Sequence, residues 1–441
     1  MSRRMRSSRA ILAMLLLASG VLMVARPAAA GVVGEIVGPG ASSYPIAIVP
    51  LRDASGGGAD GTRFADVLSN DLTLSGYFRV LDRDAYIDDP QISGMEVGEI
   101  EFLNWSTIGA LALVKGSLQR TPEGIVVEAR LFDVPGKRGL TVKRYRVAPR
   151  EFPRAAHRFA DEILRVFTGT PGPFDTQIAF VSGGTGFGKD IYTITFDQLA
   201  PQRVTNERGL IVSPAWNPDA RRILFSSYRG GPPGLHEIEV GTGQQRSLGS
   251  SGGLAAGGAW SPDGSLLATT REIDGNPEIV LVRADGRVAR RVTQHPAIDV
   301  SPTWSPDGHE LAFCSDRLGT PQIFIAGSEG GVRRVTYDGS YNTSPAWSPK
   351  GDEIAYTGRV DGRFQIFAVD VRGQAPRQLT RSPGNSEDPR WSPDGRYLVF
   401  ASTRSGGSHI FFMDRTGRIQ KQLTHGERND TSPAWSPWRR E

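Results

Sequence analysis

The sequence lacks a cysteine framework, because Cys314 is its only cysteine. A single thiol cannot form an intrachain disulfide, and it also excludes a cysteine-rich zinc site and the usual four-thiolate iron–sulfur cluster. The chain lacks a surplus of basic residues once its first thirty positions are set aside. Five of the 51 basic residues lie in that stretch, which leaves 46 against 47 acidic residues. Since a nucleic-acid backbone is bound by clustered positive charge, we expect no nucleic acid among the partners.

Complete motifs for catalysis or ligand binding are also scarce. The GGTGFGKD stretch at residues 183–190 has the spacing of a phosphate-binding loop, but Asp190 stands where Ser or Thr would meet magnesium. Residues 82–89 lack the central glycine and the final glutamate of a calcium loop. The six histidines form no HExxH motif and no close pair. We therefore expect no catalytic residue, no cofactor and no metal site.

Glycine and proline are abundant instead, with 53 and 30 residues. The high glycine and proline content predicts many turns. Hydrophobic residues make up 39% of the chain and charged residues 22%, which is typical of a folded protein rather than a disordered or multi-span membrane protein. A length of 441 residues indicates two or three folded units.

Residues 1–30 have the pattern of a secretory signal peptide: a basic start, about fifteen apolar residues and three alanines at the end. We expect cleavage between Ala30 and Gly31, because a membrane anchor, the alternative, needs about twenty apolar residues. No cysteine follows this site to carry a lipid there. The mature chain is therefore predicted to act outside the cytoplasm without direct membrane insertion.

A tryptophan motif of the type WSPDG recurs six times at intervals of 43 or 44 residues. The motif tryptophans are Trp216, Trp260, Trp304, Trp347, Trp391 and Trp435. Each interval contains four short strand patterns separated by turns, which is typical of a β-propeller blade. Three strand patterns precede the first tryptophan and one strand ends at the last, so we predict six blades, the last of them composite. An open solenoid, the alternative, leaves both fragments unexplained.

The chain before the propeller has a different pattern. Residues 44–169 combine apolar strands with two helical patterns and predict an α/β domain. The second helix is expected to bury Phe152, Ala156, Phe159, Ile163 and Val166. Residues 31–43 are glycine-rich and are predicted to form a mobile N-terminal strap, and after a short linker the propeller is expected at residues 174–441.

The repeat and the secreted α/β domain before it resemble the TolB family, the periplasmic propeller proteins of the Tol-Pal system. The likeness covers residues 31–441, with departures from the motif at Asn217, Ala220, Lys350 and Trp438. The resemblance implies a non-enzymatic, monomeric adaptor in the periplasm. It would bind the peptidoglycan-associated lipoprotein Pal through the propeller and TolA through the N-terminal region, supporting outer-membrane invagination during cell division and envelope integrity. Similar repeats also occur in prolyl-oligopeptidase-type peptidases and carbohydrate lyases, so the alternative is a periplasmic enzyme acting in the central channel.

The segments that enter the first strand of each blade differ among the repeats, whereas the Ser-Pro-Asp-Gly turns are nearly alike. Variable loops on a common scaffold are free to serve recognition. We therefore predict a partner-binding mouth formed by residues five or six positions before the motif tryptophans: Leu254, Ile298, Asp299, Tyr341, Asn342, Asn385 and Asp430. Arginines at 229, 271, 317, 359 and 404 are expected on the same face. They would either join blades by hydrogen bonds or pair with an acidic partner.

Overall fold

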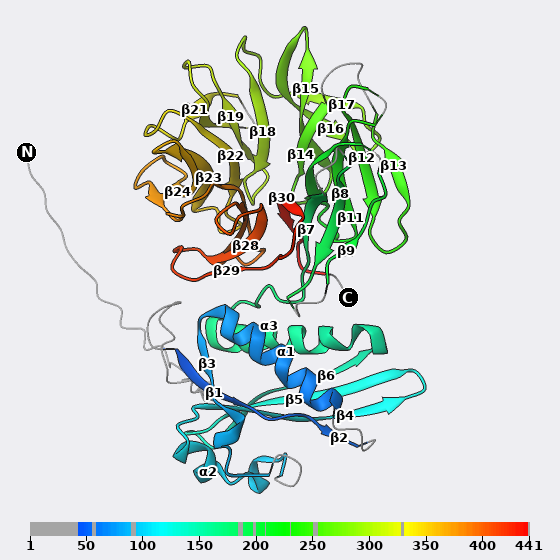
Figure 1. Ribbon diagram of the computed structural model, residues 1–441, viewed down its shortest axis with the longest axis vertical. Helices are drawn as coiled ribbons and strands as arrows, with labels where there is room; N and C mark the ends of the chain where they lie inside the picture. Colours follow the sequence, from blue (N-terminus) through cyan, green and yellow to red (C-terminus); the bar gives the residue numbers. More distant parts are fainter. Residues whose placement is uncertain are drawn as a thin grey trace, which may run out of the picture. The chain divides into compact units, whose positions relative to one another are not determined.

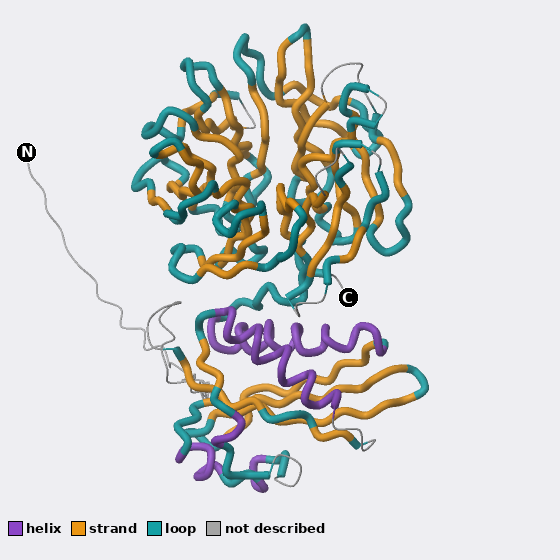
Figure 2. The backbone as a smooth tube through the Cα atoms, in the orientation of Figure 1, coloured by secondary structure: helices purple, strands orange, loops and turns teal. Residues whose placement is uncertain are grey.

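The computed structural model describes residues 43–54, 59–89, 94–183, 188–196, 200–207, 209–229, 231–249, 255–327 and 330–439. The predicted signal peptide, its cleavage site at Ala30 and Gly31, the predicted strap up to residue 42 and the predicted contact residue Leu254 lie outside these residues. Figure 1 and Figure 2 show an α/β part, which carries the helices, and a propeller built of strands and loops. Among the described residues, no helix combines the length and apolar character that a membrane crossing requires.

A mixed sheet forms the centre of the α/β part. Its strand order is β3-β1-β4-β5-β6, in which β1 is parallel to β3 and β4, and β2 adds to β4. The strands are β1 Tyr44–Ile48, β2 Arg52–Asp53, β3 Phe78–Val80, β4 Ala112–Thr121, β5 Gly124–Asp133 and β6 Arg138–Val147. The helices are α1 Ala59–Ser75, α2 Phe102–Thr107 and α3 Phe152–Thr168, with short 3₁₀ turns at Arg83–Ala85, Val97–Glu99 and Pro149–Glu151.

The α3 helix packs through the apolar face that the sequence predicts. Phe152, Ala156, Phe159 and Ile163 are buried in one core with the inward side chains of β4 and β5, and Val166 lies partly buried against it. The helix ends where Gly169 takes a φ of 81° and donates its N–H to the Arg165 carbonyl. Glycine adopts this left-handed conformation without strain, which stops the helix before the linker.

Six four-stranded antiparallel sheets form the propeller, so the predicted blade count is confirmed. Five blades are continuous in sequence. Their strands are β10–β13 (Ile211–Trp216, Arg222–Ser227, Gly234–Glu239, Gln245–Ser247), β14–β17 (Ala255–Trp260, Leu266–Ile273, Asn276–Arg283, Val288–Arg291), β18–β21 (Asp299–Trp304, Glu310–Ser315, Gln322–Gly327, Val332–Arg334), β22–β25 (Asn342–Trp347, Glu353–Val360, Arg363–Asp370, Arg377–Gln378) and β26–β29 (Ser386–Trp391, Tyr397–Ser402, His409–Asp414, Gln420–Gln422).

The sixth blade is composite, as predicted. The C-terminal strand β30 (Asn429–Trp435) pairs with β7 (Ile178–Gly183), which continues into β8 (Asp190–Ile194) and β9 (Gln202–Arg203). Trp435 lies opposite Ile178 in this register. The incomplete phosphate-loop motif therefore falls on the β7–β8 connection, where Asp190 accepts hydrogen bonds from Thr205 Oγ1 and the Glu207 N–H.

The first strand of each blade lies innermost and contains a bulge three residues before its tryptophan. The pairing register shifts at this point in all six blades. The bulge residues have φ values between 48° and 63° and are Ser213, Gly257, Ser301, Ser344, Asp388 and Ser432. The tryptophans fill the seams between blades: the indole N–H of Trp391, for example, donates to the Ala346 carbonyl of the preceding blade at 3.0 Å.

Candidate functional site

The inner strand of each blade begins at the end of the propeller where the hairpin between the second and third strands also lies. We call this end the mouth. The Tyr228 N–H donates to the Leu210 carbonyl, the Arg359 N–H to the Tyr341 carbonyl and the Thr403 N–H to the Asn385 carbonyl, at 2.9–3.0 Å. Neighbouring blades also meet here, since the Asn342 N–H donates to the Pro321 carbonyl at 2.8 Å. The variable entry loops are therefore anchored on a rigid frame.

The predicted contact residues divide by position. The sixth residue before the tryptophan is turned outward: Ile298 is 47% exposed and Tyr341 38%, and Asn385 is partly exposed. The fifth residue is turned inward: Asp299, Asn342 and Asp430 are 0–3% exposed. Successive side chains of a strand point to opposite sides, so one residue of register separates the two sets.

The sixth position before the tryptophan also holds two surface residues that the sequence prediction did not include. Leu210 and Asn429, each six residues before a motif tryptophan, are exposed. Counting back six positions from Trp216 and Trp435 finds both in the sequence. The inward neighbours Ile211 and Ser386 are fully buried, in agreement with the other blades.

Asp299 is held by Arg317 of the same blade. Both of its carboxylate oxygens accept hydrogen bonds from the guanidinium at 3.0–3.1 Å, and the arginine Nε donates to Ser315 Oγ at 2.9 Å. Arg317 also lies over the rings of Phe313 and Phe324. A buried carboxylate requires such a partner, so Asp299 supports the mouth from beneath.

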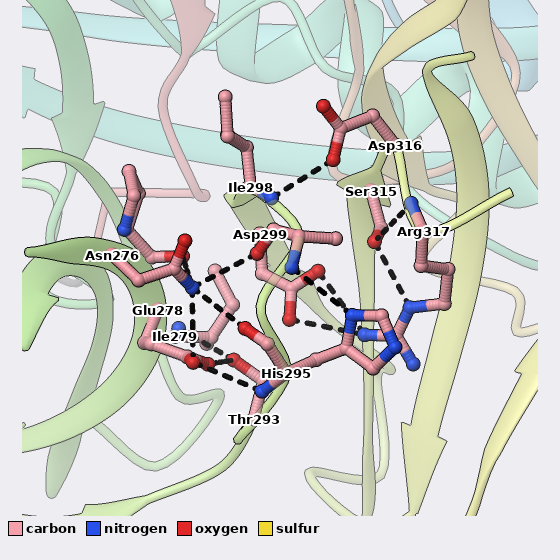
Figure 3. A network of polar contacts seen from close by, with 12 residues as sticks. Asn276, Glu278, Ile279, Thr293, His295, Ile298, Asp299, Ser315, Asp316 and Arg317 are labelled. Atoms are coloured by element: carbon pink, nitrogen blue, oxygen red, sulfur yellow. Dashed lines mark hydrogen bonds and ion pairs between the residues drawn. The ribbon is translucent and has the colours of Figure 1, made fainter. Parts of the chain in front are cut away.

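The loop that carries Ile298 is fixed by the preceding blade. Glu278 accepts hydrogen bonds from the His295 N–H at 3.0 Å and from Arg291 at 2.9 Å, and Asn276 Nδ2 donates to the carbonyls of His295 and Ala297. The Ile298 N–H donates to Asp316 Oδ1 at 2.9 Å, and Figure 3 shows Asn276, Glu278, His295, Ile298 and Asp316 in this network. Burial alone would raise the pKa of Glu278, but hydrogen bonds from Thr293, His295 and Arg291 outweigh it and lower that pKa.

A threonine at the end of the outer strand gives a similar support to the third strand of its blade. Its hydroxyl accepts the N–H of the residue at the start of the third strand at 2.8–2.9 Å in five blades. These threonines are Thr205, Thr293, Thr336, Thr380 and Thr424. In four blades the same hydroxyl also donates to a side chain of the third strand, which is Asp190, Glu278, Gln322 or Gln365. The Val-Thr and Leu-Thr endings of the repeats are the sequence signal of this device.

The five arginines expected at the mouth were predicted either to join blades by hydrogen bonds or to pair with an acidic partner. Arg317 and Arg404 each lie over two aromatic rings of their own blade and donate to a serine hydroxyl there. Their hydrogen bonds therefore stay within a blade. Arg271 is buried, and burial lowers its pKa. Arg229 and Arg359 are exposed.

Exposed large apolar side chains gather on one arc of the mouth. They are Leu210 and Tyr228 on the β10–β13 blade, Ile298 and Leu318 on the β18–β21 blade and Tyr341 on the β22–β25 blade, with exposed fractions of 37–61%. Tyr341 packs edge-on against Phe364 with ring centroids 5.6 Å apart. Among the described residues, the β26–β29 and composite blades expose no large apolar side chain at this end. An apolar arc beside a polar one is an arrangement suited to protein binding.

A cavity of about 440 Å³ lies at the turn end of the channel and is lined by tryptophans and prolines of the motif. At the bulges Asp388 accepts hydrogen bonds from Ser344 and, more weakly, from Ser432. In the part of the chain that the structure describes, no group of three or more His, Cys, Asp or Glu side chains is placed to hold a metal ion. Cys314 is buried, and burial raises the pKa of its thiol to about 11.

Comparisons with known proteins agree with this architecture. Residues 164–439 match the family described as TolB beta propeller domain, and residues 33–140 match the TolB amino-terminal domain. The Tol-Pal system protein TolB of Anaeromyxobacter dehalogenans is 40% identical over 238 residues, covering 54% of each chain. That of Chromobacterium violaceum is 34% identical over 229 residues, covering 52% of this chain and 51% of the relative. The chain thus spans about half the length of the curated relatives it matches.

A solved structure extends the likeness. The crystal structure of TolB from Acinetobacter baumannii superposes with a TM-score of 0.78 and 28% identity, covering 90% of this chain and 97% of that one. Both the α/β part and the propeller fall within that coverage.

Proposed function

Because this chain belongs to the TolB family, we propose that it is a non-enzymatic adaptor of the Tol-Pal system in the periplasm. Curated relatives that are 33–40% identical carry the name Tol-Pal system protein TolB, which supports this assignment. The predicted signal peptide supports export. The adaptor would link inner-membrane Tol components to Pal, and so support outer-membrane invagination during division and envelope integrity.

The mouth is the proposed site for Pal. Its apolar arc is the observation that carries this proposal, because Ile298, Leu318 and Tyr341 expose 38–61% of their surface on neighbouring blades. Asn385 lies beside this arc on the next blade and adds a polar contact. Asp299, Asn342 and Asp430 are buried, so their proposed role is to position the loops rather than to touch Pal. A specific complex buries about 1,200–2,000 Å² in total, for which six convergent loops suffice.

The N-terminal region at residues 31–43 is the proposed contact for TolA. This part of the proposal depends on the family resemblance, because residues up to 42 lie outside the described part of the chain. The enzyme alternative, which requires clustered acids or histidines at the channel, is favoured by no observation on the described residues, and we do not propose it.

Binding of mature protein to soluble Pal, measured by calorimetry, tests the mouth. Ile298→Glu and Tyr341→Glu should each weaken binding at least about tenfold, because each places a charge in the apolar centre of the interface. The matched control is Val288→Glu, since Val288 is 47% exposed but lies on the outer strand β17. Melting temperatures of all variants should stay close to that of the parent.

Two results would refute the assignment. Absence of Pal binding by the unaltered protein at about 100 µM would refute Pal as the partner. Equal losses of affinity from Ile298→Glu and Val288→Glu would refute the mouth as the binding site.

A further inference from the structure

The edge strand β6 of the α/β part carries a concentration of positive charge. β6 is the last strand of the sheet order and pairs with β5 alone among the described strands. The helix α3 lies next to β6, as Figure 1 shows. A cavity of about 730 Å³ is lined by residues of both elements. Seven of the residues that line it are cations: Lys143, Arg144, Arg146, Arg154, Arg158, Arg165 and Arg439.

These cations lie on both sides of the sheet. Lys143 points toward α3, where its Nζ lies 3.4 Å from Glu162, and Arg158 of α3 stacks over the ring of Tyr145 at 5.0 Å. Arg144 and Arg146 point to the opposite side, where they contact Glu128 and Glu123 at 2.7 and 2.9 Å. The alternation follows from the strand itself, since neighbouring side chains point to opposite faces.

The positive charge is only partly balanced. The carboxylates that line the cavity are Asp161, Glu162 and Asp175, three against the seven cations. Glu128 and Glu123, outside this lining, add two carboxylates that pair with Arg144 and Arg146. Asp161 is buried and accepts the backbone N–H groups of Phe174 and Asp175. The side chains of Arg144 and Arg146 are 72% and 66% exposed, so their ion pairs with glutamates are weak and exchangeable.

We propose that β6 is a docking edge for an extended acidic peptide segment of a partner protein, which adds as a further strand beside it. A strand placed there would point alternate side chains to the two faces, and each face presents cations to meet them. A compact anion such as phosphate would use only one face. The unpaired backbone groups of β6 would supply the affinity, and the arginines and Lys143 would select acidic residues. This site is separate from the mouth, so the inference does not depend on binding of Pal.

Edge strands also carry Lys and Arg simply to prevent unwanted pairing. An experiment can separate the two roles with three labelled eight-residue peptides and fluorescence anisotropy on the mature protein. An alternating Glu-Val peptide has the charge and can pair as a strand, an alternating Glu-Pro peptide keeps the charge but lacks the N–H groups for pairing, and an alternating Lys-Val peptide reverses the charge.

The Glu-Val peptide should bind at about 100 µM or below, and at least about tenfold more tightly than either of the other two. Hydrogen exchange of residues 138–147 should slow when the Glu-Val peptide is added. The double variant R144E/R146E and the single variant K143E should each weaken binding at least about fivefold, since they act on opposite faces. Arg287→Glu is the matched control, because Arg287 is 85% exposed on a propeller turn.

Several outcomes would overturn the proposal. Equal binding of the Glu-Val and Glu-Pro peptides, or unchanged exchange in β6, would indicate unspecific charge attraction. Adsorption to phosphatidylglycerol vesicles without binding of any peptide would indicate a membrane surface instead. Failure of all peptides to bind, with R144E/R146E aggregating more readily, would leave edge protection as the only role.

Discussion

At the scale of single residues, the ion pair of Asp299 and Arg317 shows how the mouth is held from below. The Asp299 side chain is 0% exposed and that of Arg317 13%, so each charge depends on the other. Asp299→Ala should lower the free energy of unfolding by about 2–4 kcal/mol, because it leaves a desolvated guanidinium with Ser315 as its remaining polar partner. The double variant D299A/R317M should recover part of this loss, since both charges are then absent. Urea unfolding followed by tryptophan fluorescence measures both effects.

The control for this cycle is Asp285→Ala. The Asp285 side chain is 54% exposed, its Oδ2 lies 3.8 Å from Arg287 Nε and its Oδ1 accepts the Arg287 N–H at 3.0 Å, so its removal should cost at most about 1 kcal/mol. Two results would contradict the supporting role of Asp299. One is an equal loss of stability from Asp299→Ala and Asp285→Ala. The other is a loss from D299A/R317M that equals the sum of the losses from Asp299→Ala and Arg317→Met measured separately.

The mouth residues also show what a sequence can tell about a site. The repeat indicated the correct stretch of chain, five or six residues before each tryptophan, because the spacing is nearly constant. It did not distinguish the exposed residue from its buried neighbour, since Asp299 and Asn342 are polar and polar residues are expected outside. Their burial depends on partners distant in sequence, such as Arg317 and Gln322. No local pattern encodes those contacts.

At the scale of elements, the bulge in each inner strand recurs in all six blades, and in five of them it places a residue other than glycine in the left-handed region. Ser301 has a φ of 57° and its side chain is exposed, so backbone strain can be tested there with little change in packing. Ser301→Val should destabilise the protein by about 1–2 kcal/mol, because a β-branched residue is disfavoured in the left-handed region. Ser301→Gly should change stability by less than about 0.5 kcal/mol, since relief of strain offsets the greater freedom of the unfolded chain.

The comparison for this pair is Thr303→Val in the same strand, where φ is not positive. A β-branched replacement suits an ordinary strand position, and the melting temperature should stay nearly constant. A loss from Thr303→Val as large as that from Ser301→Val would mean that packing, rather than backbone conformation, sets the cost.

The elements of the propeller were easier to predict than those of the α/β part. Six copies of one pattern average out local ambiguity, and a turn of the Ser-Pro-Asp-Gly type marks the end of the first strand in five blades; Gly308 in one of these turns, for example, takes a positive φ of 74°. The α/β part occurs once. Its strands and its two long helices follow from local periodicity, but the order β3-β1-β4-β5-β6 and the short helix α2 do not, because strand order is decided by long-range packing.

At the scale of the whole molecule, the ring is closed by segments about 250 residues apart in sequence. Trp435 Nε1 donates to Thr176 Oγ1 at 2.8 Å, and the Ser436 N–H donates to the Gln177 carbonyl at 2.8 Å. Propellers need such closure because an open ring leaves an unpaired edge on β7 and an uncovered blade face beside it. The composite blade therefore makes the stability of every other blade depend on β30.

Removing residues 429–441 tests this dependence directly. The shortened chain should melt at least about 10 °C lower or aggregate, because loss of β30 exposes the β7 edge and the apolar seam that Trp435 fills. A synthetic peptide of residues 427–438 should bind the shortened chain and restore the near-ultraviolet circular dichroism, since it supplies the missing strand in trans. The same peptide with Trp435→Ala should restore much less, and a chain lacking only residues 439–441 should behave like the parent. A shortened chain as stable as the parent would show that the five continuous blades stand without closure, and the ring would then have to be held by contacts between adjacent blades alone.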